Sequence, residues 1–381
     1  MILKNANNIS ELKIQDGLIA DSTNDTAILD CKNYTLIPQF IDLNVFPKNK
    51  SLSRNSLISL SKKAKNGGVG IIALNSDTNP KIDNEMAIEF IKNLDNDIEI
   101  LPLMASNNAQ NKICDISILN SLGGVGINLD SIQCANTIDK IAKYAKMLDI
   151  PIFVNADDKL GGVINYGEIS SILGLQARNP LSEIKEVAKI LEVAVFYNIK
   201  VIFSAISEIR SIELINTAKR HNSNIFAEVS IHHLVLSDEA CNNYNTSAKI
   251  NPPLKDNKTK DLLLDSLQSG KIDLLTSLQC ACYNSKKEQV FNDAEFGIDA
   301  IYYYFSLLYT YLVKTRVISL EQLINICAKN PAKILNLNCG GIDIGKEAKL
   351  MLIDLDSNYD IKDLLSPYNG KKLNGIVKEF I

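Results

Sequence analysis

The interpretation of this chain begins with the stretch Leu36-Ile37-Pro38-Gln39-Phe40-Ile41-Asp42-Leu43-Asn44-Val45-Phe46. Most of its side chains are apolar, so it predicts a buried strand. Because side chains alternate between the two faces of a strand, Asp42, Asn44 and Phe46 point the same way. The stretch therefore predicts a buried strand that ends in polar chemistry.

Apolar runs of similar length recur along the middle of the chain. The eight runs are 36–44, 69–74, 98–104, 124–129, 151–155, 200–204, 224–229 and 273–277. Helical patterns separate them, and this alternation predicts an α/β protein whose parallel strands close into a (β/α)8, or TIM, barrel. A doubly wound open sheet is the alternative. No G-x-G-x-x-G or P-loop lysine pattern supports a nucleotide-binding version of either fold.

The helical patterns are clearest in four places. After Asn136, one apolar face is formed by Ile138, Ile141, Ala142, Ala145 and Leu148. Ser182, which follows Pro180, is the predicted N-cap of a second helix. The ranges 211–221 and 320–328 predict two more helices.

The sequence pattern at both ends of the chain predicts short strands. Asp16-Gly17 predicts a hairpin turn between 11–14 and 18–20, and strand-like runs return at 349–354 and 374–381. We therefore predict a small β-sandwich domain built from residues 1–35 and 340–381, around a barrel that spans 36–339.

Composition and charge argue against several classes of partner. The 381 residues are 46% hydrophobic and carry a formal net charge of −4, which gives no electrostatic case for binding nucleic acid or an anionic membrane. No signal peptide is recognised, and no window approaches the roughly 18 uninterrupted apolar residues of a membrane span. We expect a cytoplasmic protein. Its eight scattered cysteines predict reduced core residues, and only Cys280-Ala281-Cys282 offers a weak soft-metal signal.

Several stretches, in their order and spacing, resemble the dihydroorotase branch of the amidohydrolase superfamily over nearly the whole chain. Residues 38–43 are similar to the P-G-F-I-D-L entry to the first barrel strand, 228–234 to E-V-T-P-H-H-L, and 251–254 match N-P-P-L without change. Shorter similarities lie at 66–69, 78–80, 161–168, 211–215 and 296–298. The resemblance implies a TIM barrel with zinc bound at the carboxyl ends of its strands.

The resemblance also implies where the family's metal ligands fall, and none is retained. The H-x-H pair falls on Asn44 and Phe46, and the histidines of strands five and six fall on Asn155 and Ala205. The strand-eight aspartate, which is also the family's general base, falls on Leu278. The bridging acidic position falls near Asn128-Leu129. The degenerate pocket predicted in this way consists of Asn44, Phe46, Lys48, Asp77, Asn155, Ala205, Asn251, Leu278, Gln279 and Cys282.

Zinc chemistry needs the lost side chains. Zinc takes imidazole nitrogen and carboxylate oxygen, and it lowers the pKa of bound water to about 7. Asparagine is a poor zinc ligand, and phenylalanine, alanine and leucine are not ligands. We therefore expect no catalytic residue, no bound metal and no other cofactor.

Other candidates have plainer interpretations. His221 is predicted to lie on the surface, and His232 and His233 to make structural hydrogen bonds. Asp157-Asp158 is interpreted as a pair of solvated loop acids rather than an acid–base pair. The aromatic segment 302–309 is predicted to lie partly in the core, with a partner interface as the alternative.

The leading hypothesis is a dihydroorotase-like protein of pyrimidine biosynthesis that has lost catalysis and acts as a structural or regulatory partner. Noncatalytic dihydroorotase homologues assemble with aspartate carbamoyltransferase, so the resemblance implies that partner and a homo- or hetero-oligomer. The first alternative is an active cyclic amidohydrolase with a rearranged site drawn from Asp42, Asp77, Asp130, Asp158, His232 or Cys282. The second is a metal-free barrel that binds a small molecule.

Overall fold

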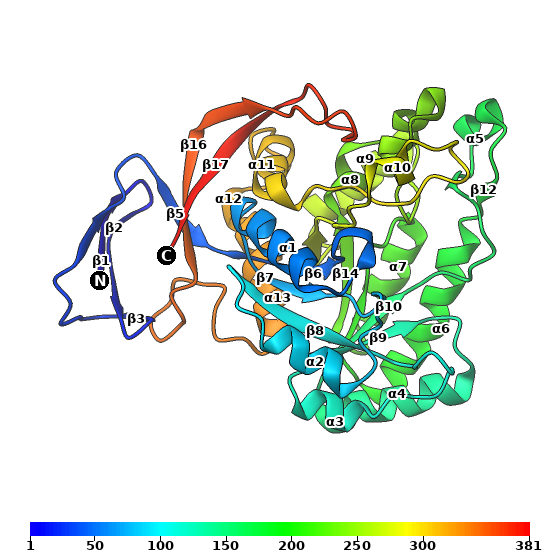
Figure 1. The fold of residues 1–381 in the computed structure, drawn as a ribbon, viewed down its shortest axis with the longest axis horizontal. Coiled ribbons are helices and arrows are strands. Elements are labelled where there is room, and N and C mark those ends of the chain that lie inside the picture. Colours follow the sequence, from blue (N-terminus) through cyan, green and yellow to red (C-terminus); the bar gives the residue numbers. More distant parts are fainter.

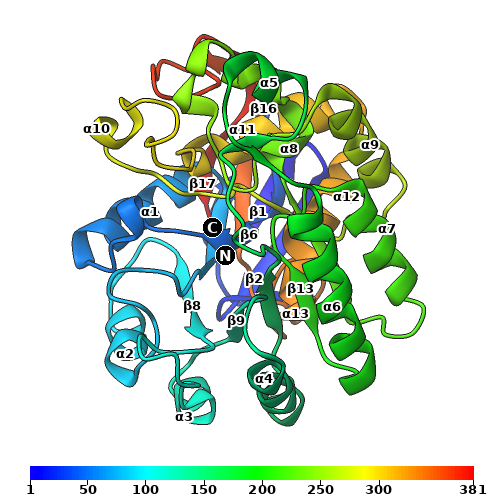
Figure 2. The ribbon, with the colours of Figure 1, turned by 90° about the vertical axis from the view of Figure 1, so that its right-hand side faces the viewer.

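A computed structural model describes residues 1–381, and its centre is an eight-stranded parallel barrel (Figures 1 and 2). Neighbouring strands pair in the order β15-β14-β13-β10-β9-β8-β7-β6. The last strand meets the first where Phe46 N donates to Gln279 O at 2.8 Å, so the sheet nearly closes. The strands are β6 (Phe40–Val45), β7 (Val69–Leu74), β8 (Glu99–Ala105), β9 (Gly126–Asp130), β10 (Ile152–Asn155), β13 (Val201–Phe203), β14 (Ile225–Ser230) and β15 (Leu274–Thr276). The predicted TIM barrel is confirmed.

Helices form the outer ring of the barrel in Figure 2. They bury apolar faces such as that of Ile138, Ile141 and Ala145, as predicted. The main helices that follow the first seven barrel strands are α1 (Arg54–Asn66), α2 (Glu85–Lys92), α3 (Ile116–Ser121), α4 (Ala135–Leu148), α6 (Leu181–Tyr197), α7 (Ile209–Ala218) and α9 (Asn257–Gln268). Shorter elements are α5 (Glu168–Leu173), α8 (Ile231–Val235), α10 (Asn284–Lys287), α11 (Tyr304–Leu308), α12 (Leu320–Ile324), α13 (Asn330–Ile334), β11 (Ile164–Asn165) and β12 (Ala177–Arg178).

The predicted cap at Ser182 is wrong. The helix α6 begins at Leu181, and Ser182 is buried within its first turn. Pro180 stands at the N-cap with φ −52° and ψ −32°, so its ring already holds the backbone in helical conformation. The helix consequently starts two residues earlier than a cap at Ser182 would place it.

Two small sheets from the chain ends form the predicted sandwich, on the left of Figure 1. One contains β3 (Leu18–Ala20), β2 (Ile9–Gln15), β1 (Ile2–Ala6) and β4 (Ile28–Asp30), and the other β17 (Lys372–Phe380), β16 (Leu350–Asp360) and β5 (Thr35–Pro38). Leu3 and Ile14 from the first sheet pack with Leu36, Leu350 and Leu352 from the second. These contacts give the sandwich its own apolar core.

The stretch 36–46 does not form one strand. It divides at Gln39, where β5 ends and β6 begins, because its first half pairs with β16 of the sandwich and its second half with β7 of the barrel. The Gln39 amide donates to Leu350 O at 2.9 Å and holds the chain at this division. The stretch therefore joins the sandwich to the barrel, and its final residues enter the barrel core.

The aromatic segment 302–309 lies mostly in the core. Tyr303, Tyr304 and Phe305 are buried, and the Phe40 ring centre lies 5.8 Å from that of Phe305. Tyr302 alone among the tyrosines of 302–304 is exposed, at 49%.

No helix of the molecule combines the length and the apolar character that crossing a membrane requires.

Candidate functional site

A cavity of about 720 Å³ opens at the carboxyl ends of the barrel strands, and we call it the mouth cavity. Each strand delivers its last residues there because all eight run in the same direction. Eight of the ten predicted pocket residues line it: Asn44, Phe46, Asp77, Asn155, Ala205, Asn251, Leu278 and Cys282.

Lys48 and Gln279 do not line the mouth cavity, so their predicted placement is wrong. Lys48 Nζ lies 4.9 Å from the ring centre of Tyr283, and Lys50 takes the position at the cavity wall. Gln279 follows Leu278, whose backbone is left-handed at φ 45°, and its side chain is buried outside the cavity lining. Its Oε1 accepts from the backbone nitrogens of Ala300 and Ile301, each at 2.9 Å.

The floor of the cavity rests on one buried carboxyl group. Glu228 Oε1 accepts from Asn44 Nδ2 at 3.2 Å and from Ala205 N at 3.1 Å. Burial, reinforced by the nearby charge of Asp42, raises the pKa of Glu228 to about 8. Its Oε2 has no hydrogen-bond partner. The carboxyl group is therefore neutral at pH 7, and it holds the ends of β6 and β13 together.

A second buried carboxylate, Asp42, lies on the same face of β6 as Asn44. It accepts from Thr276 Oγ1 at 2.6 Å and from Ser277 N at 2.9 Å. Burial raises its pKa, and the hydrogen bonds oppose that shift. These partners join β6 to β15, so Asp42 closes the barrel instead of facing the cavity.

Two of the substituted ligand positions have left-handed backbone conformations. Ala205 has φ 51° and Leu278 has φ 45°, although neither is glycine. Such a conformation costs an L-residue roughly 1–2 kcal/mol. Hydrogen bonds hold both residues, since Leu278 N donates to Thr276 Oγ1 at 2.9 Å and Ala205 N donates to Glu228.

The residues at the floor do not fit zinc. Phe46, Ala205 and Leu278 supply no ligand atom, and nowhere do three His, Cys, Asp or Glu side chains gather closely enough to hold a metal ion. The alternative ligand set is also dispersed. Asp42 and His232 are buried away from the cavity, whereas Asp77, Asp130 and Cys282 line it at separate points.

Amide side chains surround the floor, and the sequence reasoning missed two of them, Asn75 and Asn107. Asn75 and Asn107 line the cavity, and Asn128 donates from Nδ2 to Asn75 Oδ1 at 2.8 Å and to Ser76 Oγ at 3.0 Å. Asn75 directly follows β7, Asn107 follows β8 by two residues and Asn128 lies in β9. Their positions at or near strand ends could have identified them from the sequence, since parallel strands bring such residues to one edge of the sheet.

The lysines around the cavity all have partners within the protein, either in ion pairs or in a hydrogen bond. Lys50 pairs with Asp77 at 2.6 Å, and Lys286 with Glu295 at 3.1 Å. A third ion pair joins Lys159 to Asp130. The fourth lysine of the lining, Lys81, donates to Asn107 O at 2.7 Å. No cation of the cavity wall is left without a partner.

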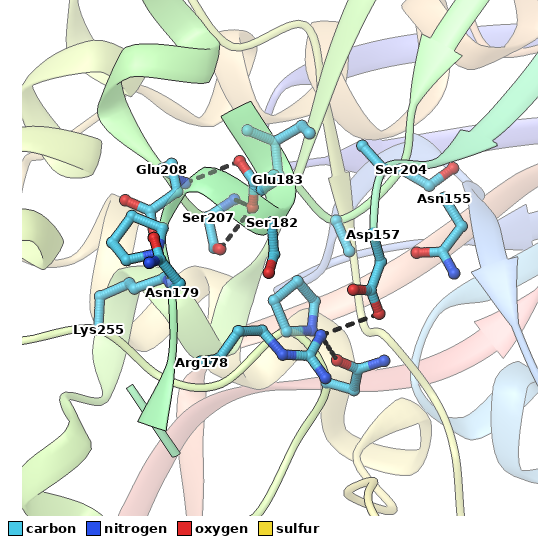
Figure 3. A pocket seen from close by; sticks show the side chains of 16 residues that line it. Asn155, Asp157, Arg178, Asn179, Ser182, Glu183, Ser204, Ser207, Glu208 and Lys255 are labelled. Atoms are coloured by element: carbon cyan, nitrogen blue, oxygen red, sulfur yellow. Dashed lines mark hydrogen bonds and ion pairs between the residues drawn. The ribbon is translucent and has the colours of Figure 1, made fainter. Parts of the chain in front are cut away.

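Arg178 braces the rim beside the floor (Figure 3). Its Nη1 donates to Asp157 Oδ2 at 3.0 Å and to Asn251 Oδ1 at 2.8 Å. Asp158 pairs with Lys185 at 2.7 Å. The interpretation of Asp157-Asp158 as solvated loop acids is therefore wrong, because both carboxylates are largely buried and ion-paired. The loop after β10 is fixed by this bracing.

A further buried carboxylate fixes the neighbouring loop. Glu183 Oε2 accepts from Ser207 N at 3.0 Å and its Oε1 from Glu208 N at 3.0 Å, as Figure 3 shows. Lys255 in turn pairs with Glu208 at 2.5 Å. Burial raises the pKa of Glu183, although the positive charge of Lys255 opposes the shift. The segment that follows Ala205 is thereby held rigidly against α6.

The histidines have structural surroundings, as predicted. His221 is exposed beyond the end of α7. His232 Nδ1 lies 2.8 Å from Tyr368 Oη, and His233 Nδ1 lies 2.7 Å from Ser230 Oγ. Burial lowers the pKa of His232 to about 4 and that of His233 to about 3, so both are neutral at pH 7.

All eight cysteines are free, and five of them are buried as predicted: Cys31, Cys114, Cys241, Cys327 and Cys339. Cys280 and Cys282 line the mouth cavity. Burial raises the pKa of Cys280 to about 11, which keeps its thiol protonated and weakens it as a metal ligand or nucleophile.

The sequence profile of the amidohydrolase family matches residues 131–381, about two thirds of the chain. The chain belongs to the amidohydrolase family. Its similarity to dihydroorotases extends further: a dihydroorotase of Thermoanaerobacter sp. is 29% identical over 384 residues, which cover 96% of this chain and 87% of the relative. A probable dihydroorotase-like protein of Helicobacter pylori is 28% identical over 394 residues, which cover 100% and 96%.

Solved structures share the fold of this chain. The L-hydantoinase (dihydropyrimidinase) of Arthrobacter aurescens superposes with a TM-score of 0.86 at 19% identity, over 100% of this chain and 94% of that one. A D-hydantoinase gives a TM-score of 0.83 at 20% identity, over 100% and 93%. At this level of identity the likeness shows the fold. This dihydroorotase-like member of the family thus keeps the common scaffold around an altered floor.

Proposed function

We propose that this chain is a dihydroorotase-like barrel that does not carry out metal-dependent hydrolysis. The proposal is supported by the side chains at the floor of the mouth cavity. Asn44, Phe46, Asn155, Ala205 and Leu278 occupy the positions at which the resemblance expects ligands and the general base. None of them provides the imidazole or carboxylate that zinc and proton transfer require.

The packing of the floor also supports this proposal. Glu228 accepts hydrogen bonds from Asn44 and Ala205, and Asp42 accepts one from Thr276, which joins β6 to β15 where the barrel closes. A metal ion would need these carboxyl groups to leave their present partners. Introducing a dication beside the apolar side chains of Phe46 and Leu278 would also carry a desolvation cost.

Metal analysis and a hydrolysis assay on the purified chain test this function together. We expect far less than one zinc per chain and no dihydroorotate hydrolysis above the buffer rate, with a zinc-loaded dihydroorotase as the positive control. Stoichiometric zinc accompanied by turnover would overturn the proposal.

The proposed role of the scaffold is structural or regulatory, with aspartate carbamoyltransferase as the partner. This part is supported by the resemblance to dihydroorotases, whose noncatalytic homologues assemble with that transferase. Mixing the two proteins and measuring mass by light scattering during size-exclusion chromatography tests the assembly. We expect one species heavier than either component, whereas two independent peaks would reject this partner.

A further inference from the structure

We propose that the mouth cavity binds an uncharged, hydrogen-bonding small molecule of nucleoside or disaccharide size. The inference rests on the proposed function, because it concerns the cavity without a metal ion. It goes beyond that function by giving the retained cavity a ligand of its own. The ligand class also differs from an anionic substrate such as dihydroorotate.

The size of the cavity indicates a ligand larger than one small ring. Its volume of about 720 Å³ lies within the roughly 300–1,000 Å³ typical of sites for drug-sized molecules. The loops that enclose it are held in place from outside, by Arg178 with Asp157 on one side and by Glu183 with Ser207 on another. The cavity is therefore a preformed space, and binding needs little ordering of the chain.

The charges of the wall argue for an uncharged ligand. Four lysines and four carboxylates line the cavity, so the formal charges cancel. Lys50, Lys159 and Lys286 are ion-paired, and Arg178 at the rim is paired with Asp157. An anionic ligand would have to compete with a carboxylate for these three lysines and with the carbonyl oxygen of Asn107 for Lys81. A cationic ligand would face the same obstacle at the carboxylates.

The free polar groups of the cavity are neutral. The side chain of Asn155 makes no hydrogen bond within the protein and is exposed to the cavity, and Asn251 uses only its Oδ1. Asn107 is 3% exposed, lines the cavity and leaves its Oδ1 without a partner. Amides of this kind offer donors and acceptors together, which suits hydroxyl and amide groups.

The apolar side chains of the floor complete the recognition surface. Phe46 and Leu278 follow β6 and β15, which meet where the barrel closes, whereas Asn155 ends β10, so one part of the cavity wall is apolar and another part carries amides. A ring with an apolar face and polar edges matches both parts at once. Nucleosides and disaccharides share this chemistry, and uncharged probes of each kind can tell them apart.

Calorimetric titration of the full chain tests the ligand class with matched probes. Uridine and trehalose are the uncharged probes, and uridine monophosphate, trehalose 6-phosphate and dihydroorotate are the charged ones. We expect one uncharged probe to bind at least tenfold more tightly than every charged probe. The probe that binds identifies the nucleoside or the sugar class. Absence of binding by both uncharged probes at 10 mM, or tighter binding of a charged probe, would overturn the inference.

Two variants test whether the ligand binds in the mouth cavity. Asn155→Ala removes an amide that makes no contact with the protein, so we expect unchanged thermal stability and at least tenfold weaker binding. Asn93→Ala is the matched control, because Asn93 is an exposed asparagine that precedes β8 at the opposite end of the barrel. Equal affinity of the two variants would overturn the assignment. Zinc content and hydrolysis measured on the same sample report on the proposed function separately.

Discussion

The amide nitrogen of Asn44 lies 3.2 Å from Oε1 of Glu228, in the interior of the barrel. The same oxygen accepts from the backbone of Ala205, so a single carboxyl group joins two positions at which the family resemblance expects metal ligands. No cation lies against this carboxyl group, and its second oxygen has no partner. The carboxyl group of Glu228 therefore holds a proton in the folded chain. Its ionisation makes the stability of the fold depend on pH.

The variant Glu228→Gln is expected to gain stability relative to the wild-type chain as the pH rises. In the folded chain the pKa of Glu228 is about 8, above its ordinary value of 4.5. Between these values the unfolded chain ionises while the folded chain holds the proton, so wild-type stability falls with rising pH. Glutamine does not titrate. The difference in unfolding free energy between variant and wild type should grow by about 4 kcal/mol from pH 5 to pH 8, at about 1.4 kcal/mol per unit. Urea unfolding at pH 5, 6.5 and 8 measures it, and parallel pH profiles would contradict it.

Lys249→Met is expected to destabilise the chain by about 3 kcal/mol, within the range for buried polar groups that lose their partners. Lys249 is 2% exposed, and its Nζ donates to the carbonyl oxygens of Phe291, Asn292 and Ala294 at 2.6, 3.0 and 2.5 Å. Methionine fills similar space but leaves these three carbonyls unpaired. Denaturant unfolding measures the loss. Lys271→Met is the control, because the exposed Lys271 side chain makes no contact of this kind; an equal loss in both variants would refute the explanation.

Arg178→Ala is expected to lower the free energy of unfolding by about 3 kcal/mol, because it leaves the carboxylate of Asp157 buried without its cation. The side chains of Arg178 and Asp157 are only 13% and 12% exposed. Adding Asp157→Asn to Arg178→Ala removes the unpaired charge, so the double variant should regain more than 1 kcal/mol of that loss. Chemical denaturation of the four chains of this cycle gives the coupling. Strictly additive losses would show that the pair does not act as a unit.

Tyr368→Phe is expected to cost about 1–2 kcal/mol, because it leaves the buried Nδ1 of His232 without a partner. Tyr368 lies between β16 and β17, and its contact with His232 joins the C-terminal hairpin to the barrel at α8. Thermal unfolding should show the loss. Tyr302→Phe is the matched control, since Tyr302 is 49% exposed and its hydroxyl makes no hydrogen bond within the chain. A larger effect at Tyr302 would contradict the proposed contact.

The residues that follow each strand could be placed from the sequence because their positions depend on local order. The run 69–74 coincides with β7, and Asn44, Asn155 and Leu278 reach the mouth cavity as their strand positions require. Gln279 shows the limit of this reasoning. The left-handed backbone of Leu278 interrupts the regular alternation of a strand, and the Gln279 side chain lies in the core, where it caps the segment that begins at Ala300.

By itself, the sequence determined the alternation of strands and helices, the two-ended sandwich and the kinds of side chain at the strand ends, since periodicity and composition are local properties. Only the tertiary structure decided how the charges pair. Arg178 meets Asp157 across 21 residues and Asn251 across 73, and Glu228 meets Asn44 across 184. Such contacts depend on where the closed barrel brings distant strand ends together, and no local pattern encodes that distance.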